Sequence, residues 1–233
     1  MMGGEDIYKN GRYLEQNPSW HLEQSPWKAK QILKLLRRND VPCRTICEVG
    51  CGAGEILLQL HEQMPPETTF DGYEISPQAF AMTSLRKRDR INFHLKDLLD
   101  ADVHFDVVMA IDVIEHVEDC FSFLRRLRTK ATYKVLHIPL DLSVQTVLRS
   151  KPIMTARKGV GHIHYFTKET AMATLEDMGY TIIDHFYTAG MVEFPGKQLR
   201  SKLLSWPRRV FHKIHSDLAV RVLGGYSIMV LAK

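Results

Sequence analysis

The chain has 233 residues, a hydrophobic fraction of 45% and a formal net charge of +4. This length allows one large domain or two small ones, and the apolar content is that of a globular protein with a packed core. No run of about 18 apolar residues occurs, so the sequence predicts no membrane-spanning helix. Residues 1–10 carry charges without an apolar segment, and we therefore expect a cytoplasmic protein without a secretory signal.

The cysteines do not predict a metal site. Cys43, Cys47 and Cys51 recur at a spacing of four, and Cys120 stands apart. This spacing matches neither the common zinc patterns nor the common iron–sulfur patterns. Cys47 falls inside a predicted strand, where a thiol packs as a small apolar group. We predict reduced, structural cysteines, which agrees with a cytosolic location.

Residues 1–40 precede the first predicted strand. Ser25 and Pro26 begin a predicted helix, because proline is favoured in the first turn of a helix. The segment before Ser25 is rich in aromatic and turn residues, which is typical of a packed arm. We expect the arm and its helix to form a lid over the ligand pocket of the same domain.

The central part of the chain alternates short apolar runs with helical patterns, which predicts a parallel sheet covered by helices on both faces. The predicted strands are 45–49, 69–75, 91–95, 105–111, 133–138, 181–187 and 226–232. Ser76 and Pro77 are expected to cap and begin the helix after the second strand. The pattern loosens after Pro139 and resumes at Thr167, a predicted N-cap.

A glycine-rich turn follows the first strand in the segment EVGCGAGE, residues 48–55. Its glycines allow a sharp turn, and a ligand can lie against the bare backbone beside a helix N-terminus. The dinucleotide fingerprint G-x-G-x-x-G requires a small residue where this chain has Glu55. The turn therefore disfavours a nicotinamide dinucleotide.

Acidic residues end several of the predicted strands, at the sheet edge where open α/β sheets bind ligands. Glu48 belongs to the first strand, Glu74 closes the second, Asp97 follows the third and Asp112 closes the fourth. Four acids around one glycine turn suit a ligand that carries an ammonium and a sulfonium better than one that carries phosphates.

The segments EVGCGAGE, FDGYEIS, LKDLL and MAIDVIEHVED, taken in order, resemble the successive S-adenosylmethionine (SAM)-binding motifs of class I methyltransferases. The resemblance covers residues 45–138 and continues less closely to Tyr187. It implies a doubly wound, Rossmann-like α/β fold with a seven-stranded, mostly parallel sheet whose last strand is antiparallel. We predict one domain over 1–233, consisting of an N-terminal helical lid (1–40), a SAM-binding core (41–187), a basic helical insertion (188–225) and a final strand (226–233).

The resemblance also implies residue roles for a cofactor that leaves as S-adenosylhomocysteine. Glu48, Gly50, Cys51, Gly52 and Gly54 would surround the methionine moiety, Glu74 and Ile75 the ribose, and Asp97 and Leu98 the adenine. Asp112 would lie beside the methionine amine or the transferred methyl group.

The acceptor side is predicted around Glu115 and His116, because this pair resembles one that lies near the acceptor in quinone-type O-methyltransferases. We predict both as catalytic residues. The acceptor contacts are predicted to be Trp20, His162, His164 and Tyr165. The ring that contacts the sulfonium is predicted to be that of Trp20 or Trp27. Core packing of Trp20, and hydrogen bonds that fix the connection at 162–165, are the alternatives.

We assign no metal ligands from the sequence. The alternative is a divalent cation held by Asp112, Glu115, His116 and a histidine of the segment GHIH (161–164), which is similar to the arrangement in small-RNA 3′-terminal 2′-O-methyltransferases. The first acid of that motif is Asp here, and no RNA-binding module is evident.

The insertion 188–225 is strongly basic, with seven Lys or Arg and one acid between Lys197 and Arg221. It predicts two helices broken at Pro207, the second with Phe211, Ile214, Leu218 and Val222 along one face. The insertion is interpreted as a packed cap, as a surface for an anionic membrane, or as a site for a phosphorylated or nucleic-acid acceptor. Nucleic acid is disfavoured because the segment has few aromatic residues for stacking.

Together these features predict a SAM-dependent methyltransferase that acts at oxygen on a small or lipid-linked acceptor. A metal-dependent RNA 2′-O-methyltransferase is one alternative. The other is a non-catalytic SAM-binding domain that acts through a partner.

Overall fold

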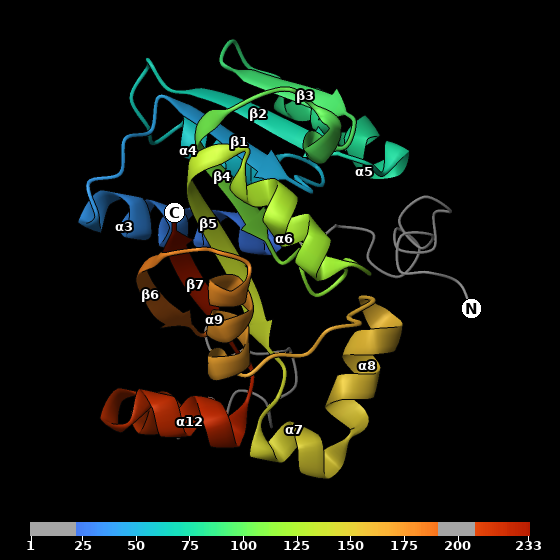
Figure 1. Ribbon diagram of the computed structural model, residues 1–233, viewed down its shortest axis with the longest axis vertical. Coiled ribbons are helices and arrows are strands. Elements are labelled where there is room, and N and C mark those ends of the chain that lie inside the picture. Colours follow the sequence, from blue (N-terminus) through green and yellow to red (C-terminus); the bar gives the residue numbers. More distant parts are fainter. Residues whose placement is uncertain (1–21, 191–207) are drawn as a thin grey trace.

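The computed structural model describes residues 22–190 and 208–233 (Figure 1). The predicted arm with Trp20, and the first predicted helix of the insertion, lie outside the described residues. Within the described residues, no helix is both long and apolar enough to cross a membrane.

A seven-stranded sheet forms the centre of the molecule, in the order β3-β2-β1-β4-β5-β7-β6. The strands are β1 (Thr45–Val49), β2 (Thr69–Glu74), β3 (Ile91–Leu95), β4 (Phe105–Ile111), β5 (Ala131–Leu140), β6 (Ile182–Thr188) and β7 (Tyr226–Ala232). The strands β1 to β5 pair in parallel, and β7 runs antiparallel to both of its neighbours, β5 and β6. The predicted fold class is therefore confirmed, including the antiparallel last strand.

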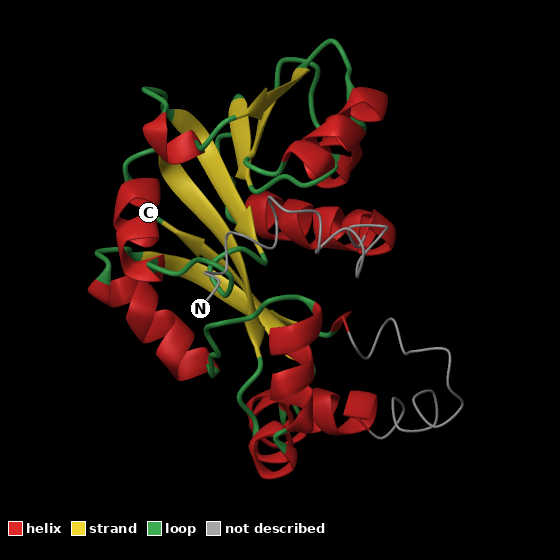
Figure 2. Cartoon of the chain, turned by 90° about the vertical axis from the view of Figure 1, so that its right-hand side faces the viewer, coloured by secondary structure: helices red, strands yellow, loops and turns green. Residues whose placement is uncertain are grey.

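Helices cover both faces of the sheet (Figure 2). They are α3 (Ser25–Arg38), α4 (Glu55–His61), α5 (Pro77–Met82), α6 (Cys120–Arg128), α7 (Val144–Arg149), α8 (Lys151–Gly159), α9 (Lys168–Asp177) and α12 (Ser216–Leu223), with short 3-10 turns η1 (Leu22–Gln24), η2 (Thr83–Arg86) and η3 (Leu98–Asp100). One apolar core lies between the sheet and the helices α3 and α4, and a second lies beneath α6 and α9.

Local sequence signals set several helix starts, as predicted. The Ser76 hydroxyl accepts a hydrogen bond from the Ala79 N–H at the start of α5. Thr167 caps α9 through a reciprocal capping box with Thr170. Each cap satisfies a backbone N–H that has no partner inside its helix. Helix α3 begins at Ser25 with Pro26 in its first turn, as expected.

The loosened apolar pattern between Pro139 and Thr167 did not predict the helices of this stretch. Helices α7 and α8 lie there, and α7 starts with a capping box between Ser143 and Thr146. Neither helix buries a complete side chain. They therefore lack the apolar periodicity from which a helix is read in a sequence.

The second predicted helix of the insertion is also different from the expectation. The helical segment 208–214 ends before His215, and α12 starts after it. Ile214 and Leu218, which were predicted on the packed face, are exposed. Ala219 and Val220 form the buried face of α12 instead. The predicted face assumed one continuous helix, whereas the helix is interrupted at His215.

Candidate active site

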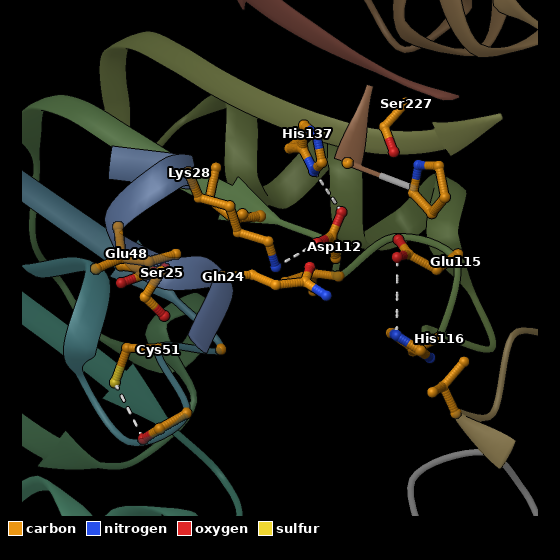
Figure 3. A pocket seen from close by; sticks show the side chains of 18 of the residues that line it. Gln24, Ser25, Lys28, Glu48, Cys51, Asp112, Glu115, His116, His137 and Ser227 are labelled. Carbon is orange, nitrogen blue, oxygen red and sulfur yellow. Dashed lines mark hydrogen bonds and ion pairs between the residues drawn. The ribbon is translucent and has the colours of Figure 1, made fainter. Parts of the chain in front are cut away.

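A cavity of about 520 Å³ opens at the carboxyl ends of the central strands, a size typical of small-molecule sites. Its wall combines the glycine turn after β1, the end of β4, the first turn of α3, the end of β5 and the start of β7. Figure 3 shows side chains from these distant segments converging on the cavity.

The glycine turn adopts left-handed backbone conformations, with φ of 67° at Gly50, 56° at Gly52 and 80° at Gly54. The N–H groups of Gly50 and Cys51 donate to the Tyr73 carbonyl at 2.8 and 3.1 Å, which fixes the turn to β2. A Cβ on Gly50 would come within 3.2 Å of the Val113 side chain. Gly50, Cys51 and Gly52 line the cavity, whereas Gly54 does not.

Glu74 ties the glycine turn to the end of β2. Its Oε2 accepts from the Gly52 N–H at 2.8 Å, and its Oε1 accepts from the N–H groups of Ile75 and Ser76 at 2.9 and 2.8 Å. Burial raises the pKa of Glu74, and these three hydrogen bonds oppose the shift. Since a carboxylate offers about four acceptor positions, roughly one remains for a ligand hydroxyl. Ile75 also lines the cavity.

Glu48 is a buried acid that lacks a complete set of partners. Only 2% of the residue is exposed, and its Oε2 has no hydrogen-bond partner. Burial raises its pKa to about 8, the Lys28 ammonium opposes this shift, and the Glu74 charge adds to it. A carboxyl group in this state suits a cationic ligand, because the ligand's charge would stabilise the ionised form. The glycine turn and Glu48 thus fit the methionine end of SAM.

Asp112 is held by two cationic or potentially cationic partners at the end of β4 (Figure 3). Its Oδ2 lies 2.6 Å from Lys28 Nζ, and its Oδ1 lies 2.5 Å from His137 Nδ1. Burial would raise the pKa of Asp112, but His137 and Lys28 outweigh it and hold that pKa well below its ordinary range. Asp112 also has a φ of 55°, which is uncommon for a residue other than glycine.

Besides Gly54, two predicted cofactor residues do not line the cavity, Asp97 and Leu98. Asp97 accepts a hydrogen bond from the Leu99 N–H at 2.8 Å and caps η3. Leu98 is completely buried in the apolar core. The structure therefore gives both residues local structural roles, and their predicted contact with adenine stays a prediction.

Glu115, His116 and His162 form a cluster on the other side of the cavity. Glu115 is fully buried, and neither carboxyl oxygen has a hydrogen-bond partner. The Nε2 atoms of His116 and His162 lie 3.7 and 4.0 Å from Glu115 Oε1. The three residues offer ligand atoms within 4.8 Å of one another, so this cluster could hold a metal ion. Asp112, which the alternative metal set included, is not part of this cluster.

The hydrogen bonds of the two histidines orient their rings. His116 Nδ1 donates to the Gly161 carbonyl at 3.2 Å, and His162 Nδ1 donates to Asp141 Oδ2 at 2.6 Å. Both assignments leave Nε2 as the acceptor of each ring. Burial lowers the pKa of His116 to about 4, and burial followed by the Asp112 charge raises that of Glu115 well above its ordinary value. At neutral pH, His116 is therefore uncharged.

The predicted acceptor contacts at residues 162–165 do not all line the cavity. His162 lines the cavity, but His164 Nε2 donates to the Val117 carbonyl at 2.8 Å and lies outside the cavity wall. Tyr165 also lies outside that wall, and its hydroxyl donates to the His162 carbonyl at 2.9 Å. These two residues fix the connection, which is the alternative that the sequence left open.

Sequence reasoning missed three charged residues of the cavity, Lys28, Glu55 and Asp141. Lys28 belongs to α3, where the helical pattern gives no sign of a polar role. Asp141 follows β5 directly, so its place at a strand end could have revealed it. Trp27 of α3 also lines the cavity, and its ring lies edge-on to His137 at 6.3 Å between centroids.

The sheet order, the glycine turn after β1 and the acids at the strand ends define a class I SAM-dependent methyltransferase. A family model described as a methyltransferase domain matches residues 19–185. The chain belongs to this family, and the resemblance noted in the sequence is confirmed.

Curated relatives match the chain over part of its length. The ubiquinone biosynthesis O-methyltransferase of Rickettsia bellii (strain OSU 85-389) is 28% identical over 131 residues, which cover 54% of this chain and 52% of that protein. The protein of the same name from Rickettsia conorii is 32% identical over 91 residues, which cover 38% of this chain and 32% of that protein. The chain thus spans about half the length of such relatives, or less.

Solved structures share the fold at low sequence identity. Magnesium protoporphyrin IX methyltransferase from Synechocystis PCC 6803, with bound S-adenosylhomocysteine, has a TM-score of 0.59 and 17% identity and covers 89% of this chain and 82% of its own. The N-methyltransferase NodS from Bradyrhizobium japonicum WM9 was also solved in complex with S-adenosylhomocysteine. It has a TM-score of 0.55 and 15% identity, and the match covers 88% of this chain and 84% of NodS. These likenesses support the architecture and not a particular acceptor.

Proposed function

We propose that this protein transfers the methyl group of SAM to a hydroxyl oxygen of a small or lipid-linked acceptor. The observation that carries the proposal is the division of one cavity into two chemically different sides. Glu48 and the glycine turn suit a cationic donor, and the cluster of Glu115, His116 and His162 suits an acceptor that must lose a proton. The names of the curated relatives support oxygen as the methylated atom.

The donor supplies an activated methyl group, so the residues of this chain have two tasks. They hold the reacting atoms in line at about 3–3.5 Å, and they accept the hydroxyl proton. Asp141 fixes the His162 ring with Nε2 as its acceptor, and that atom lies 4.0 Å from Glu115 Oε1, in a residue that also lines the cavity. We assign the proton-accepting role to this cluster, with His162 in place of His116, because burial lowers the pKa of His116 to about 4.

A second candidate is cation-assisted transfer at the same cluster. Glu115, His116 and His162 offer one carboxylate and two imidazole ligands, and Asp141 would orient the second imidazole from behind. A cation there would supply charge stabilisation for the acceptor oxygen. Loss of transfer on adding a chelator, with recovery on adding magnesium or zinc, supports this candidate, and insensitivity to chelation contradicts it.

The test of the function measures transfer of radiolabelled methyl from SAM. The acceptors are a catechol with a short prenyl tail, the same catechol without the tail, and a short RNA. We expect methylation of the catechols at oxygen. His162→Gln should lower turnover roughly 10²–10⁴-fold without a change in S-adenosylhomocysteine affinity, and exposed His104→Gln serves as the control. Methylation of RNA alone, or equal turnover in the two variants, contradicts the proposal.

We also propose that the acceptor is reached at an anionic membrane surface. Helices α7, α8 and α12 lie together at one end of the molecule (Figure 1). Exposed apolar side chains on this end include Val144, Val147, Leu148, Met154, Ile214 and Leu218. The charged residues between 142 and 161 are Arg149, Lys151, Arg157 and Lys158, all basic. An apolar face with a basic border favours anionic lipid.

This end of the molecule adjoins the cavity, because Val160 after α8 and Gly225 after α12 both line it. A lipid-linked acceptor bound there could enter without leaving the bilayer surface completely. The test is flotation with vesicles of phosphatidylcholine, with and without phosphatidylglycerol. Leu148→Asp should reduce binding to the anionic vesicles, whereas Leu85→Asp, at a similarly exposed leucine on η2, should not. Equal binding of both variants contradicts membrane docking.

A further inference from the structure

A buried chain of hydrogen bonds leads from the edge of the sheet to an acid of the cavity. Thr188 is the last residue of β6, an edge strand, and is 3% exposed. Its Oγ1 lies 2.8 Å from Nε2 of His137, which is also 3% exposed. His137 Nδ1 lies 2.5 Å from Asp112 Oδ1, as Figure 3 shows. Thr188 is not among the described residues of the cavity wall, so it reaches the cavity only through His137.

The chemistry of the three groups assigns the donors. The pKa of Asp112 is held well below its ordinary range, so its carboxylate can only accept and His137 Nδ1–H donates to it. The Thr188 hydroxyl can serve Nε2 in either protonation state, because a hydroxyl both donates and accepts. Without that hydroxyl, Nε2 would be buried without a partner. A ring turned by 180° would then compete, and it would present a carbon atom to Asp112.

Asp112 is a residue whose conformation must be held in place. Its φ of 55° is uncommon for a residue other than glycine, and such a conformation persists only where the surrounding structure fixes it. His137 binds Asp112 twice, because its carbonyl accepts from the Asp112 N–H at 3.0 Å and its ring binds the carboxylate. The turn that starts at Asp112 carries Glu115 and His116 to the cavity. The orientation of the His137 ring therefore bears on how this turn presents its acid.

Packing alone does not require a polar chain at this place. The bond between His137 and Thr188 spans β7, which lies between β5 and β6. Met229 of β7 pairs with His137 and belongs to the apolar core against α3. Apolar side chains of similar shape could fill the positions of His137 and Thr188 at little cost in stability, since both hydrogen-bond partners would be replaced together. The polar chain instead ends at an acid that lines the cavity.

We propose that His137 and Thr188 are positioning residues that orient Asp112 in the ligand cavity. Thr188 fixes the His137 ring, and the ring fixes the Asp112 carboxylate and its left-handed backbone. Lys28 binds the other carboxylate oxygen at 2.6 Å, so the direction of the acid is set from two sides. The proposal concerns the shape of the cavity that receives SAM and does not depend on the acceptor.

The first experiment is calorimetric titration of threonine variants with S-adenosylhomocysteine. Thr188→Val keeps the shape of the side chain and removes the hydroxyl, and it should weaken binding roughly tenfold, as for the loss of one hydrogen bond. Thr188→Ser retains the hydroxyl and should bind within about threefold of the wild type. Thr69→Val, at an exposed threonine of β2, is the control and should leave the affinity unchanged. Thr188→Ala replaces the Val variant if that variant does not fold.

A double-mutant cycle tests whether Thr188 acts through Asp112. Asp112→Asn suits the same left-handed backbone, because asparagine tolerates it. In that background Thr188→Val should change the affinity by less than about twofold, since residues that act as one unit are not additive. A full tenfold loss in the Asn background would overturn the proposal, as would unchanged affinity in Thr188→Val alone. Equal losses in the Ser and Val variants would show a packing role and overturn it too. Failure of every acceptor assay would leave these binding results unaffected.

Discussion

The buried carboxyl group of Glu48 should make the ligand-free protein less stable as the pH rises. Its folded-state pKa is raised to about 8, mainly by burial, whereas an unfolded glutamate has a pKa of about 4.3. The folded state therefore binds the extra proton between these two values, and the free energy of unfolding decreases through that window. Glu48→Gln keeps the shape of the protonated side chain and removes the titration.

The expected magnitude follows from the two pKa values. Each pH unit inside the window changes the difference in unfolding free energy between the variant and the wild type by about 1.4 kcal/mol. From pH 5 to pH 7 the unfolding free energy of the Gln variant should therefore rise by about 2–3 kcal/mol relative to that of the wild type. For a protein of this size, that gain corresponds to a relative rise in melting temperature of roughly 5–10 °C. Below about pH 4 the titration should contribute no difference between the two proteins.

The assay is thermal and urea unfolding of both proteins without ligand, at half-unit steps from pH 5 to pH 8. Comparing the variant with the wild type at each pH cancels the titration of all other groups to first order. Glu67→Gln, at an exposed glutamate, is the control for the substitution itself. A difference that stays constant across this range would show that Glu48 is already ionised and paired, which would refute the reasoning.

Three further predictions concern the fold around the site. Gly54→Ala should lower the unfolding free energy by several kcal/mol in urea unfolding, because the residue has a φ of 80° and a Cβ would meet a phenylalanine ring of β3. Gly159→Ala is the control, because a Cβ there would enter open space, and an equal loss in both variants would contradict the reasoning. Tyr180→Phe should cost about 1 kcal/mol of unfolding free energy by removing a buried 2.7 Å hydrogen bond to a carbonyl of α6, and no loss would contradict that role. Glu74→Gln should weaken S-adenosylhomocysteine binding by about 1–3 kcal/mol and also lower the melting temperature, because an amide cannot accept all three backbone N–H bonds. A normal melting temperature would show that the glycine turn does not depend on these three hydrogen bonds.

The sequence predicted the sheet and its turn well because their signals are local. Strand β7 was predicted at its observed bounds, and the caps at Ser76 and Thr167 were predicted correctly. In each case the residues that make the structure are adjacent or a few positions apart. The helices α7 and α8 were missed because they bury no complete side chain and leave no apolar period.

The candidate site was predicted only in part. Glu115, His116 and His162 were predicted on the acceptor side, and they do converge on the cavity. Their individual states were not predictable, because those depend on which partner each ring nitrogen finds. His164 illustrates the limit, since it is two positions from His162 but bonds to the Val117 carbonyl away from the cavity.

The sequence by itself determined the positions of the strands along the chain, the glycine turn and the set of acids at the strand ends, since short-range periodicity and spacing encode all three. Only the tertiary structure decided which of those acids are paired. Lys28 and Asp112 are far apart in the chain, and packing of α3 against the sheet brings them to 2.6 Å. Glu48 is left with an unpartnered oxygen by the same packing. Charge state and ligand preference depend on burial and distance between remote segments, and neither quantity is written in local sequence.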